Sequence, residues 1–360
     1  MSDPRLIDPS RRRALQALLW LGTAAVTRRA GAGSPAGCID VHHHFIPDAF
    51  RRFWSAPGRG PAPPMQWTLE ADLAEMDRGG IDTALLSMFT PYDAGSTAER
   101  QRLSREINEA GAALVAAHPR RFGLLATLPL PDLDASLAEA AHALDQLHAD
   151  GLALYTNSGD RWLGHASFAP LLAELNRRAA VVFVHPTTAA CCRGLVQDVP
   201  DPVVEYGTDT SRCIASLVFS GTLARFPDIR FIFSHGGGTM PFLIERFLGG
   251  SAAELVPGVV TEGQSGPYAP HQPPGGALAA IRRLHFDTAQ CANPVAMRAL
   301  RGVVPASQVL FGSDYFYRSP GGTVRALEHC GVFDRRELHA VERGNALRLF
   351  PRLRVAAPPG

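Results

Sequence analysis

The stretch Asp40–His44 holds the residue types and spacing that most clearly suggest chemistry. Alternate side chains of a β-strand point to the same side, so His42 and His44 would project together. His43 would point the other way and is expected to have a structural role. Two imidazoles side by side at a strand end suit a divalent metal ion. The alternative is that both are packed or hydrogen-bonded histidines, and the pair alone does not decide between these interpretations.

Three other short apolar runs also end in residues that could bind a metal ion: His185, His235 and Asp314. Each has a structural alternative, because His185 could close its strand, His235 could be a turn residue, and Asp314 could cap a helix. If these strand ends share one rim, independent coincidence is improbable. Together with His42 and His44 they predict a metal site, and the remaining histidines are expected to be structural.

The elements that must position these residues follow a repeated pattern after residue 34. Short apolar runs alternate with helix-period segments, which is typical of βα units in a parallel sheet. Predicted strands cover Ile39–His44, Thr83–Ser87, Gly123–Leu128, Gly151–Tyr155, Val181–His185, Arg230–His235, Leu284–Asp287 and Val309–Asp314. Predicted helices include Ala98–His118, Leu133–Ala149, Pro170–Arg178, Ser211–Arg225, Asn293–Leu300 and Glu337–Phe350. Eight such units indicate an α/β fold, a (β/α)8 barrel, whose active sites lie at the carboxyl ends of the strands. Two Pro/Gly-rich segments, Arg51–Gln66 and Val256–Gly276, are expected to be long loops.

The composition is typical of a globular protein with a large core. The 360 residues are 46% hydrophobic and 19% charged, and the net charge is +1. This balance does not indicate nucleic acid or an acidic membrane surface as a partner. All 35 basic residues are arginine, so no lysine is available for a Schiff base or for a carboxylated bridge between two metals. Any metal site is therefore expected to be mononuclear.

The six cysteines show no CxxC spacing, which argues against a zinc ribbon. Cys191 and Cys192 are adjacent. Buried packing is the expected role of this pair, and a disulfide or a reactive thiol is the alternative.

Residues 1–33 are expected to be an export signal. Arg11–Arg13 precede an apolar run, Ala14–Val26, that is too short to cross a bilayer as a stable helix and resembles a secretory signal core. The paired arginines are typical of twin-arginine signals, and Ala30–Ala32 offers a cleavage site. The mature protein, residues 34–360, would then be periplasmic and have no membrane segment. The alternative is a basic N-terminus that stays on a cytoplasmic protein.

Several segments together resemble the amidohydrolase-related family. They are Asp40-x-His42-x-His44, Val184-His185-Pro186, Ser234–Gly238, Gly312-Ser313-Asp314 and Gly344–Phe350. Within the family the chain looks like the branch that contains the aminocarboxymuconate-semialdehyde, resorcylate and carboxyvanillate decarboxylases. Cys191-Cys192, Asp209–Arg212 and Pro227–Arg230 look most like sequences labelled 6-methylsalicylate decarboxylase. The resemblance covers about residues 38–350 and implies a (β/α)8 barrel of the metal-dependent hydrolase type.

The resemblance implies a role for each strand-end residue. One divalent metal ion, commonly zinc and sometimes manganese, would be held by His42, His44, His185 and Asp314. His235 would be the acid/base residue beside it. A proton would be delivered to the substrate by His235, by Asp314 or by water held between them. Three imidazoles and one carboxylate leave a position open for the substrate, as a catalytic zinc site requires.

The resemblance also implies how a substrate anion is bound. Arg246 lies where relatives use an arginine lent to the neighbouring subunit's substrate carboxylate, which indicates a homodimer with composite sites. Arg59 is a second residue expected to bind a carboxylate. Phe316 stands where relatives often have proline, so the substrate pocket is expected to differ there.

The predicted function is non-oxidative decarboxylation of a small aromatic carboxylate, an ortho-hydroxybenzoate of the 6-methylsalicylate type. No redox cofactor is needed, because the electrons of the broken bond stay on the ring carbon that receives the proton. The first alternative is a metal-dependent hydrolase of a lactone or related ester on the same scaffold, with His235 shuttling protons. The second is a metal-carrying binding protein, in which His235 would have no role.

Overall fold

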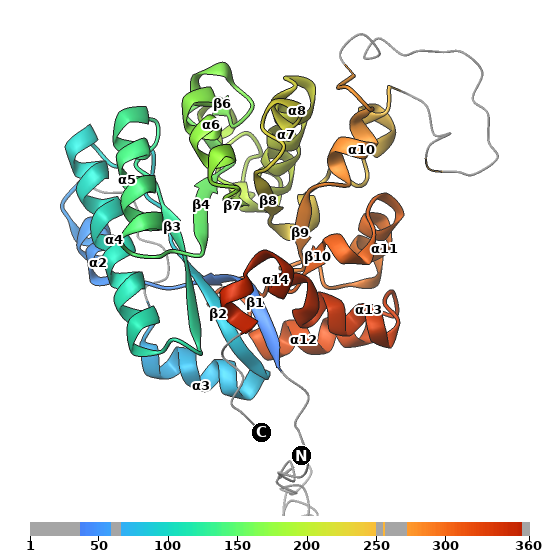
Figure 1. Cartoon of the computed structure of the whole chain (residues 1–360), viewed down its shortest axis with the longest axis horizontal. Helices are drawn as coiled ribbons and strands as arrows, with labels where there is room; N and C mark the ends of the chain where they lie inside the picture. The colour runs from blue at the N-terminus through green and yellow to red at the C-terminus, as the bar shows by residue number, and fades with distance from the viewer. Residues whose placement is uncertain (1–36, 59–65, 250–254, 256–271, 355–360) are drawn as a thin grey trace, which may run out of the picture. The chain divides into compact units, whose positions relative to one another are not determined.

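Parallel strands form the central sheet of the computed structural model, which describes residues 37–58, 66–249, 255 and 272–354. Within these residues one sheet has eight strands in the order β1-β2-β3-β4-β7-β8-β9-β10. They are β1 (Cys38–His44), β2 (Ile81–Ser87), β3 (Phe122–Thr127), β4 (Gly151–Tyr155), β7 (Val181–His185), β8 (Arg230–Phe233), β9 (His285–Asp287) and β10 (Val309–Leu310). A short antiparallel pair, β5 (Asn157–Ser158) and β6 (Arg161–Trp162), follows β4. The predicted strands are confirmed, and Figure 1 shows helices around the outside of the sheet.

The sheet closes on itself between its first and last strands. The backbone N of Val41 donates to Phe311 O at 3.0 Å, and the backbone N of Asp314 donates to His42 O at 2.9 Å. His43 also forms a parallel bridge with Tyr315. These contacts place the segment after β10 directly beside β1. The predicted α/β class and (β/α)8 barrel are therefore confirmed.

Two strands end at least two residues earlier than the sequence predicted, and β3 ends one residue earlier. β8 ends at Phe233 rather than at His235, and β10 ends at Leu310 rather than at Asp314. The reason lies in the backbone, because His235 has a φ of 53° and Asp314 a φ of 65°. These angles belong to the left-handed region, which a strand does not contain. Both side chains therefore project from turns just beyond their strands.

The helices follow the strands in the predicted alternation. They are α2 (Asp48–Ser55), α3 (Leu69–Gly79), α4 (Thr97–Ala117), α5 (Leu133–Asp145), α6 (Ala169–Arg177), α7 (Glu205–Phe219), α8 (Thr222–Arg225), α9 (Ile244–Phe247), α10 (Ala277–Ile281), α11 (Pro294–Val303), α12 (Pro320–His329), α13 (Arg335–His339) and α14 (Asn345–Leu349). The loop predicted at Arg51–Gln66 is wrong at its start, because α2 extends to Ser55. Most of the predicted loop Val256–Gly276 lies outside the described residues. No helix in the described ranges has the length and apolar character needed to span a membrane.

Two apolar layers follow the alternation of side chains along the strands. Leu85, Leu125, Phe183 and Ile232 belong to one buried cluster. Their neighbours along the strands belong to a second buried cluster that includes residues of the surrounding helices. Because residues two apart share a face of a strand, His185 points to the same side as Phe183. Burial of both faces also explains why the strands read as nearly continuous apolar runs.

Candidate metal centre

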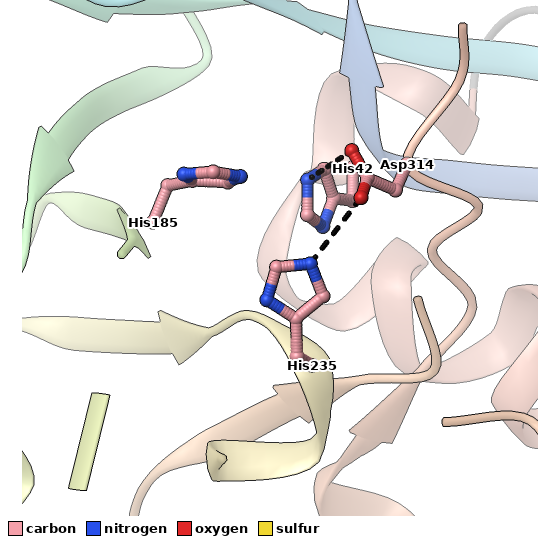
Figure 2. A group of neighbouring side chains, drawn as sticks. All are labelled: His42, His185, His235 and Asp314. Atoms are coloured by element: carbon pink, nitrogen blue, oxygen red, sulfur yellow. Dashed lines mark hydrogen bonds and ion pairs between the residues drawn. The ribbon is translucent and has the colours of Figure 1, made fainter. Parts of the chain in front are cut away.

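The five residues predicted as metal ligands or acid/base groups meet at the carboxyl ends of four strands. His42 and His44 belong to β1, His185 ends β7, His235 follows β8, and Asp314 follows β10. Four of them are buried, and His235 is partly buried. The ligand atoms of His42, His185, His235 and Asp314 lie within 4.8 Å of one another. Figure 2 shows these three rings gathered around one point, with Asp314 beside His42.

Three ligand atoms form a triangle beside this point. The Nε2 atoms of His42 and His44 are 3.2 Å apart, and Asp314 Oδ1 lies 3.3 Å from the first and 3.2 Å from the second. Nitrogen ligands in a tetrahedral zinc site, each about 2.0–2.1 Å from the ion, are separated by roughly 3.3 Å. The triangle therefore matches one face of such a site, and these residues fit a divalent cation.

The other ring nitrogen of each predicted histidine ligand already has an acceptor. Nδ1 lies 2.7 Å from Asp287 Oδ2 in His42, 3.3 Å from Ser87 O in His44, and 2.8 Å from Pro186 O in His185. A neutral imidazole has one N–H, so donation from Nδ1 leaves the Nε2 lone pair free. The facing lone pairs of His42 and His44 repel each other unless a proton or a cation lies between them.

The buried carboxylates stabilise one positive charge in the cluster. Burial disfavours a charged ring, but Asp287 and Asp314 outweigh it and raise the pKa of His42 to about 10. Burial lowers the pKa of His44, and burial with the neighbouring rings lowers that of His185 well below its usual range. Burial acts to raise the pKa of Asp314, yet the histidines around it lower it well below its usual range. A cation can therefore take the place of the proton on His42.

The two oxygens of Asp314 face different partners. Oδ1 faces His42 and His44, whereas Oδ2 lies 3.3 Å from His235 Nε2 and accepts a hydrogen bond from the side-chain amide of Gln290. Oδ1 is therefore placed to bind a metal ion together with His42 and His44. Oδ2 is placed to share a proton with His235. The group of mutually close ligand atoms includes His235 rather than His44, so His235 stands directly beside the expected ion position.

Asp287 was not predicted as a site residue, yet it supports two parts of the cluster. At the end of β9, it accepts from His42 through Oδ2 and from the backbone N of His235 through Oδ1, the latter at 2.8 Å. The signal that could have identified it is its place as the polar residue at the carboxyl end of a predicted strand. Gln290, three residues later, carried no such signal.

His43 makes the structural contacts that the alternation predicts. Its Nδ1 lies 3.0 Å from Asp40 Oδ2, and its Nε2 lies 2.8 Å from Asp72 Oδ1. Asp40 also accepts from the backbone N of Ser313 at 3.0 Å and from its hydroxyl at 2.5 Å. This network fixes the turn that carries Asp314 against β1.

A cavity of about 700 Å³ opens onto the cluster. Much of its wall is aromatic and includes Phe89, Tyr155, Tyr206 and Tyr317. Phe89 stacks on Tyr155 with ring centroids 4.7 Å apart. An apolar wall with a few convergent polar groups is typical of a site for a small aromatic molecule.

The arginines predicted to bind substrate are not found in this pocket. Arg246 is exposed on α9 and does not contact the cavity formed by the described residues, and Arg59 lies outside those residues. Among the described residues that line the cavity, Arg193 is the one arginine. Its guanidinium donates to the hydroxyl of Tyr92 and lies 3.4 Å from Asp93 Oδ2. Sequence reasoning missed Arg193, because nothing in its segment indicated that the chain turns toward the barrel mouth.

The adjacent cysteines precede Arg193. Both are free thiols, and Cys192 is buried whereas Cys191 is exposed. The packing role expected from the sequence therefore holds for Cys192 only.

Comparisons with known proteins identify a family and several relatives. The family model described as Amidohydrolase matches residues 39–352. The decarboxylase yanB of Aspergillus niger is 40% identical over 342 residues, which cover 89% of each chain. The 6-methylsalicylic acid decarboxylase acuB of Aspergillus aculeatus is 37% identical over 340 residues, 89% of this chain and 98% of the relative. A solved structure of a dihydroxybenzoic acid decarboxylase from Polaromonas sp. JS666 contains bound manganese and an inhibitor. It matches this chain with a TM-score of 0.73 at 18% identity, and the match covers 88% of this chain and 97% of the solved chain.

Proposed function

This chain belongs to the amidohydrolase family, and we propose that it is a metal-dependent decarboxylase. Its substrate would be a small aromatic carboxylic acid of the 6-methylsalicylate type. The observation that carries the proposal is the triangle of His42, His44 and Asp314, whose edges of 3.2 to 3.3 Å suit a divalent ion. The relatives at 40% and 37% identity, a decarboxylase and a 6-methylsalicylic acid decarboxylase, support the reaction and the substrate class.

One divalent metal ion would be held by His42, His44, His185 and Asp314, with zinc as the first choice and manganese as the alternative. Imidazole and carboxylate ligands accept either ion, and the Polaromonas structure contains manganese. When bound, the ion would act as a Lewis acid toward the oxygens of the substrate. The three histidines would present unprotonated Nε2 atoms to it, because their Nδ1 atoms are hydrogen-bonded elsewhere.

Decarboxylation consumes one proton at the ring carbon that loses the carboxyl group. His235 Nε2 and Asp314 Oδ2 lie 3.3 Å apart and both residues line the cavity, so they can hold this proton between them and deliver it. After the proton reaches the ring carbon, the bond to the carboxylate breaks, its electron pair restores the aromatic ring, and CO₂ leaves. No electrons pass to another group, so no redox cofactor is required.

The pocket wall can orient an aromatic substrate. Phe89 and Tyr155 present ring surface to the cavity, and aromatic pairs add to the free energy of apolar burial. Burial raises the pKa of Tyr206, so its hydroxyl stays neutral at ordinary pH. A neutral hydroxyl can donate a hydrogen bond to an oxygen of an anionic substrate.

We also propose a homodimer in which Arg246 binds the substrate carboxylate in the partner's site and Arg59 binds a carboxylate as well. Arg246 is exposed, and nearby Phe242 is 89% exposed. Exposed arginine and aromatic side chains are enriched at protein interfaces. Light scattering should give twice the chain mass. Inactive Arg246→Ala and His42→Ala proteins, when mixed, should regain activity through one intact site per mixed dimer, and a monomeric mass or no regain would contradict the composite site.

Export through the twin-arginine route is a further part of the proposal and concerns residues 1–33. The arginines Arg11–Arg13 before the apolar run Ala14–Val26 support it. Replacing the three arginines by lysine should keep the chain in the cytoplasm. The exported wild-type chain should lack about the first 33 residues by mass. An uncleaved wild-type chain in the cytoplasm would favour the alternative location.

The reaction is tested by measuring CO₂ release from a panel of 2-hydroxybenzoic acids, including 6-methylsalicylic acid, with protein loaded with zinc or manganese. Release from at least one acid is expected, with hydrogen in place of the carboxyl group in the product. No release across the panel would remove the decarboxylase assignment. Product analysis in heavy-oxygen water separates the hydrolase alternative, because the label enters a hydrolysed lactone but not a decarboxylated ring.

A further inference from the structure

Gln290 contacts Asp314 from a neighbouring turn, and the reaction described above assigns it no role. It lies three residues after the end of β9 and lines the cavity. Its side-chain nitrogen donates to Oδ2 of Asp314, the same oxygen that faces His235 Nε2 at 3.3 Å. Asp314 is buried, whereas Gln290 is exposed to the cavity. An amide at the surface of the pocket therefore reaches a carboxylate beneath it.

The backbone around this contact is strained at three places. Gln290 and His235 both have a φ of 53°, and Asp314 has a φ of 65°. Among the described residues, only three other non-glycine residues, His148, Ala179 and Asp198, have a positive φ. Such angles cost free energy, and they persist where the surroundings require them, often at functional sites. Here three strained turns aim their side chains at one carboxylate.

Two donors on one oxygen restrict how the Asp314 carboxylate can turn. Rotation about the bond that carries the carboxylate would exchange its two oxygens. The contacts to Gln290 and His235 hold Oδ2 on the cavity side, which keeps Oδ1 between His42 and His44. The amide of Gln290 has no ionisable proton, so it cannot itself protonate a substrate.

We propose that Gln290 is a positioning residue for the proton transfer, which it serves by fixing the Asp314 carboxylate so that Oδ2 stays between His235 and the substrate ring. The inference rests on the proposed decarboxylation. In that step the proton held between His235 and Asp314 forms a bond to the ring carbon, and the carbon–carbon bond to the carboxylate breaks. The electron pair of that bond restores the ring, and CO₂ leaves. His235 and Asp314 then regain a proton from solvent. Without Gln290, the carboxylate turns more freely and the proton is less often in line with the ring carbon.

Two variants test the role from different directions. Gln290→Met keeps the approximate size of the side chain and removes the donor. Gln290→Asn keeps an amide but shortens its reach, and asparagine suits a positive φ, so the turn stays intact. Gln308→Met is the matched control, because the Gln308 amide donates to Arg282 O at 2.7 Å in an exposed setting and does not line the cavity. Metal content, KM, kcat and the solvent deuterium isotope effect on kcat are measured for each protein.

Both Gln290 variants should lose about 10- to 100-fold in kcat, the range for partners that orient residues beside a metal ion. Metal content and KM should stay close to wild type, and the isotope effect should increase because proton transfer becomes slower. Unchanged kcat in the asparagine variant would overturn the proposal even if the methionine variant fails to fold. Loss of metal in parallel with kcat would also overturn it, because Gln290 would then act on metal binding. A wild-type protein without CO₂ release would instead refute the proposed function itself.

Discussion

Both ends of the barrel contain shielded histidines, His42 fully buried and His285 partly buried, and their surroundings differ. At the carboxyl end, His42 lies between Asp287 and Asp314, which outweigh the effect of burial and raise its pKa to about 10. At the amino end, His285 begins β9, and burial lowers its pKa to about 4. His285 Nδ1 has no hydrogen-bond partner among the described residues. The strand β9 thus carries a histidine without a carboxylate at one end and a carboxylate that serves a histidine at the other.

This difference indicates that the neighbouring acids, and not the histidines alone, suit the cluster at the carboxyl end to a cation. A buried imidazole without an acid stays neutral and acts as a packed side chain. Two carboxylates beside a buried imidazole stabilise the positive charge of its proton, and a metal ion can take the place of that proton. In (β/α)8 barrels, chemistry generally lies at the carboxyl ends of the strands, whereas the amino ends contribute stability.

The largest effect is expected from removing a predicted metal ligand at the carboxyl end. His42→Ala should lose the bound metal ion and lower kcat/KM by more than about 10³-fold, since Lewis-acid stabilisation is worth several kcal/mol. Elemental analysis and CO₂ release measure both effects. His285→Gln is the matched control at the amino end and should keep metal and activity. Equal losses in the two variants would show that the two ends do not differ in function.

Removing the acid/base residue should separate chemistry from metal binding. His235→Gln should lower kcat by about 10²-fold or more, because it removes the ring that holds the transferred proton beside Asp314. The metal content should stay at the wild-type level. If His235→Gln instead loses the metal ion, His235 is a ligand, and the division between the two oxygens of Asp314 is wrong.

Removing the acid that supports His42 should have a smaller effect. Asp287→Asn leaves the direct ligands in place but removes the charge beside His42 Nδ1. Metal affinity should fall about 10- to 100-fold, which a competition titration with a chelating dye measures. Asp145→Asn is the control, because Asp145 forms an exposed ion pair with Arg178. Wild-type affinity in Asp287→Asn would show that the acid does not contribute to the centre.

The smallest effect concerns pH and the amino end of the barrel. His285 has a folded-state pKa of about 4, below the 6.5 of an unfolded histidine, so the unfolded state binds more protons between these values. Stability from a neutral His285 is therefore present above pH 6.5 and is lost as the pH falls toward 4. The melting temperature of His285→Gln should decrease between pH 7 and pH 5 by roughly 2 °C less than that of wild type. A parallel decrease in both proteins would mean that His285 is protonated as easily in the folded state.

The sequence predicted the eight strands and which strand-end residues gather at one end of the barrel, for physical reasons that are local. His42 and His44 were found because alternation along a strand is short-range, and His185, His235 and Asp314 because each closes an apolar run. Asp287 also closes a predicted strand, but its role as the hydrogen-bond partner of His42 does not follow from that position. It acts on His42 from 245 residues away, through the closure of the barrel between its first and last strands.

The pocket wall and the turn geometry were beyond prediction from a single sequence. Arg193 lines the cavity because the segment after β7 folds toward the barrel mouth, and loop paths are not determined by hydrophobic periodicity. Gln290 reaches Asp314 from a positive φ that its residue type does not favour. Contacts of this kind depend on the folded arrangement of several loops at once.

The most direct test of the account is a metal titration of the chelated protein, followed by CO₂ release from 6-methylsalicylic acid or the best acid of the panel. The account predicts no turnover without metal and a rate that rises with added zinc or manganese to a plateau at one ion per chain. Full turnover by protein that elemental analysis shows to be metal-free, with no response to either ion, would contradict it.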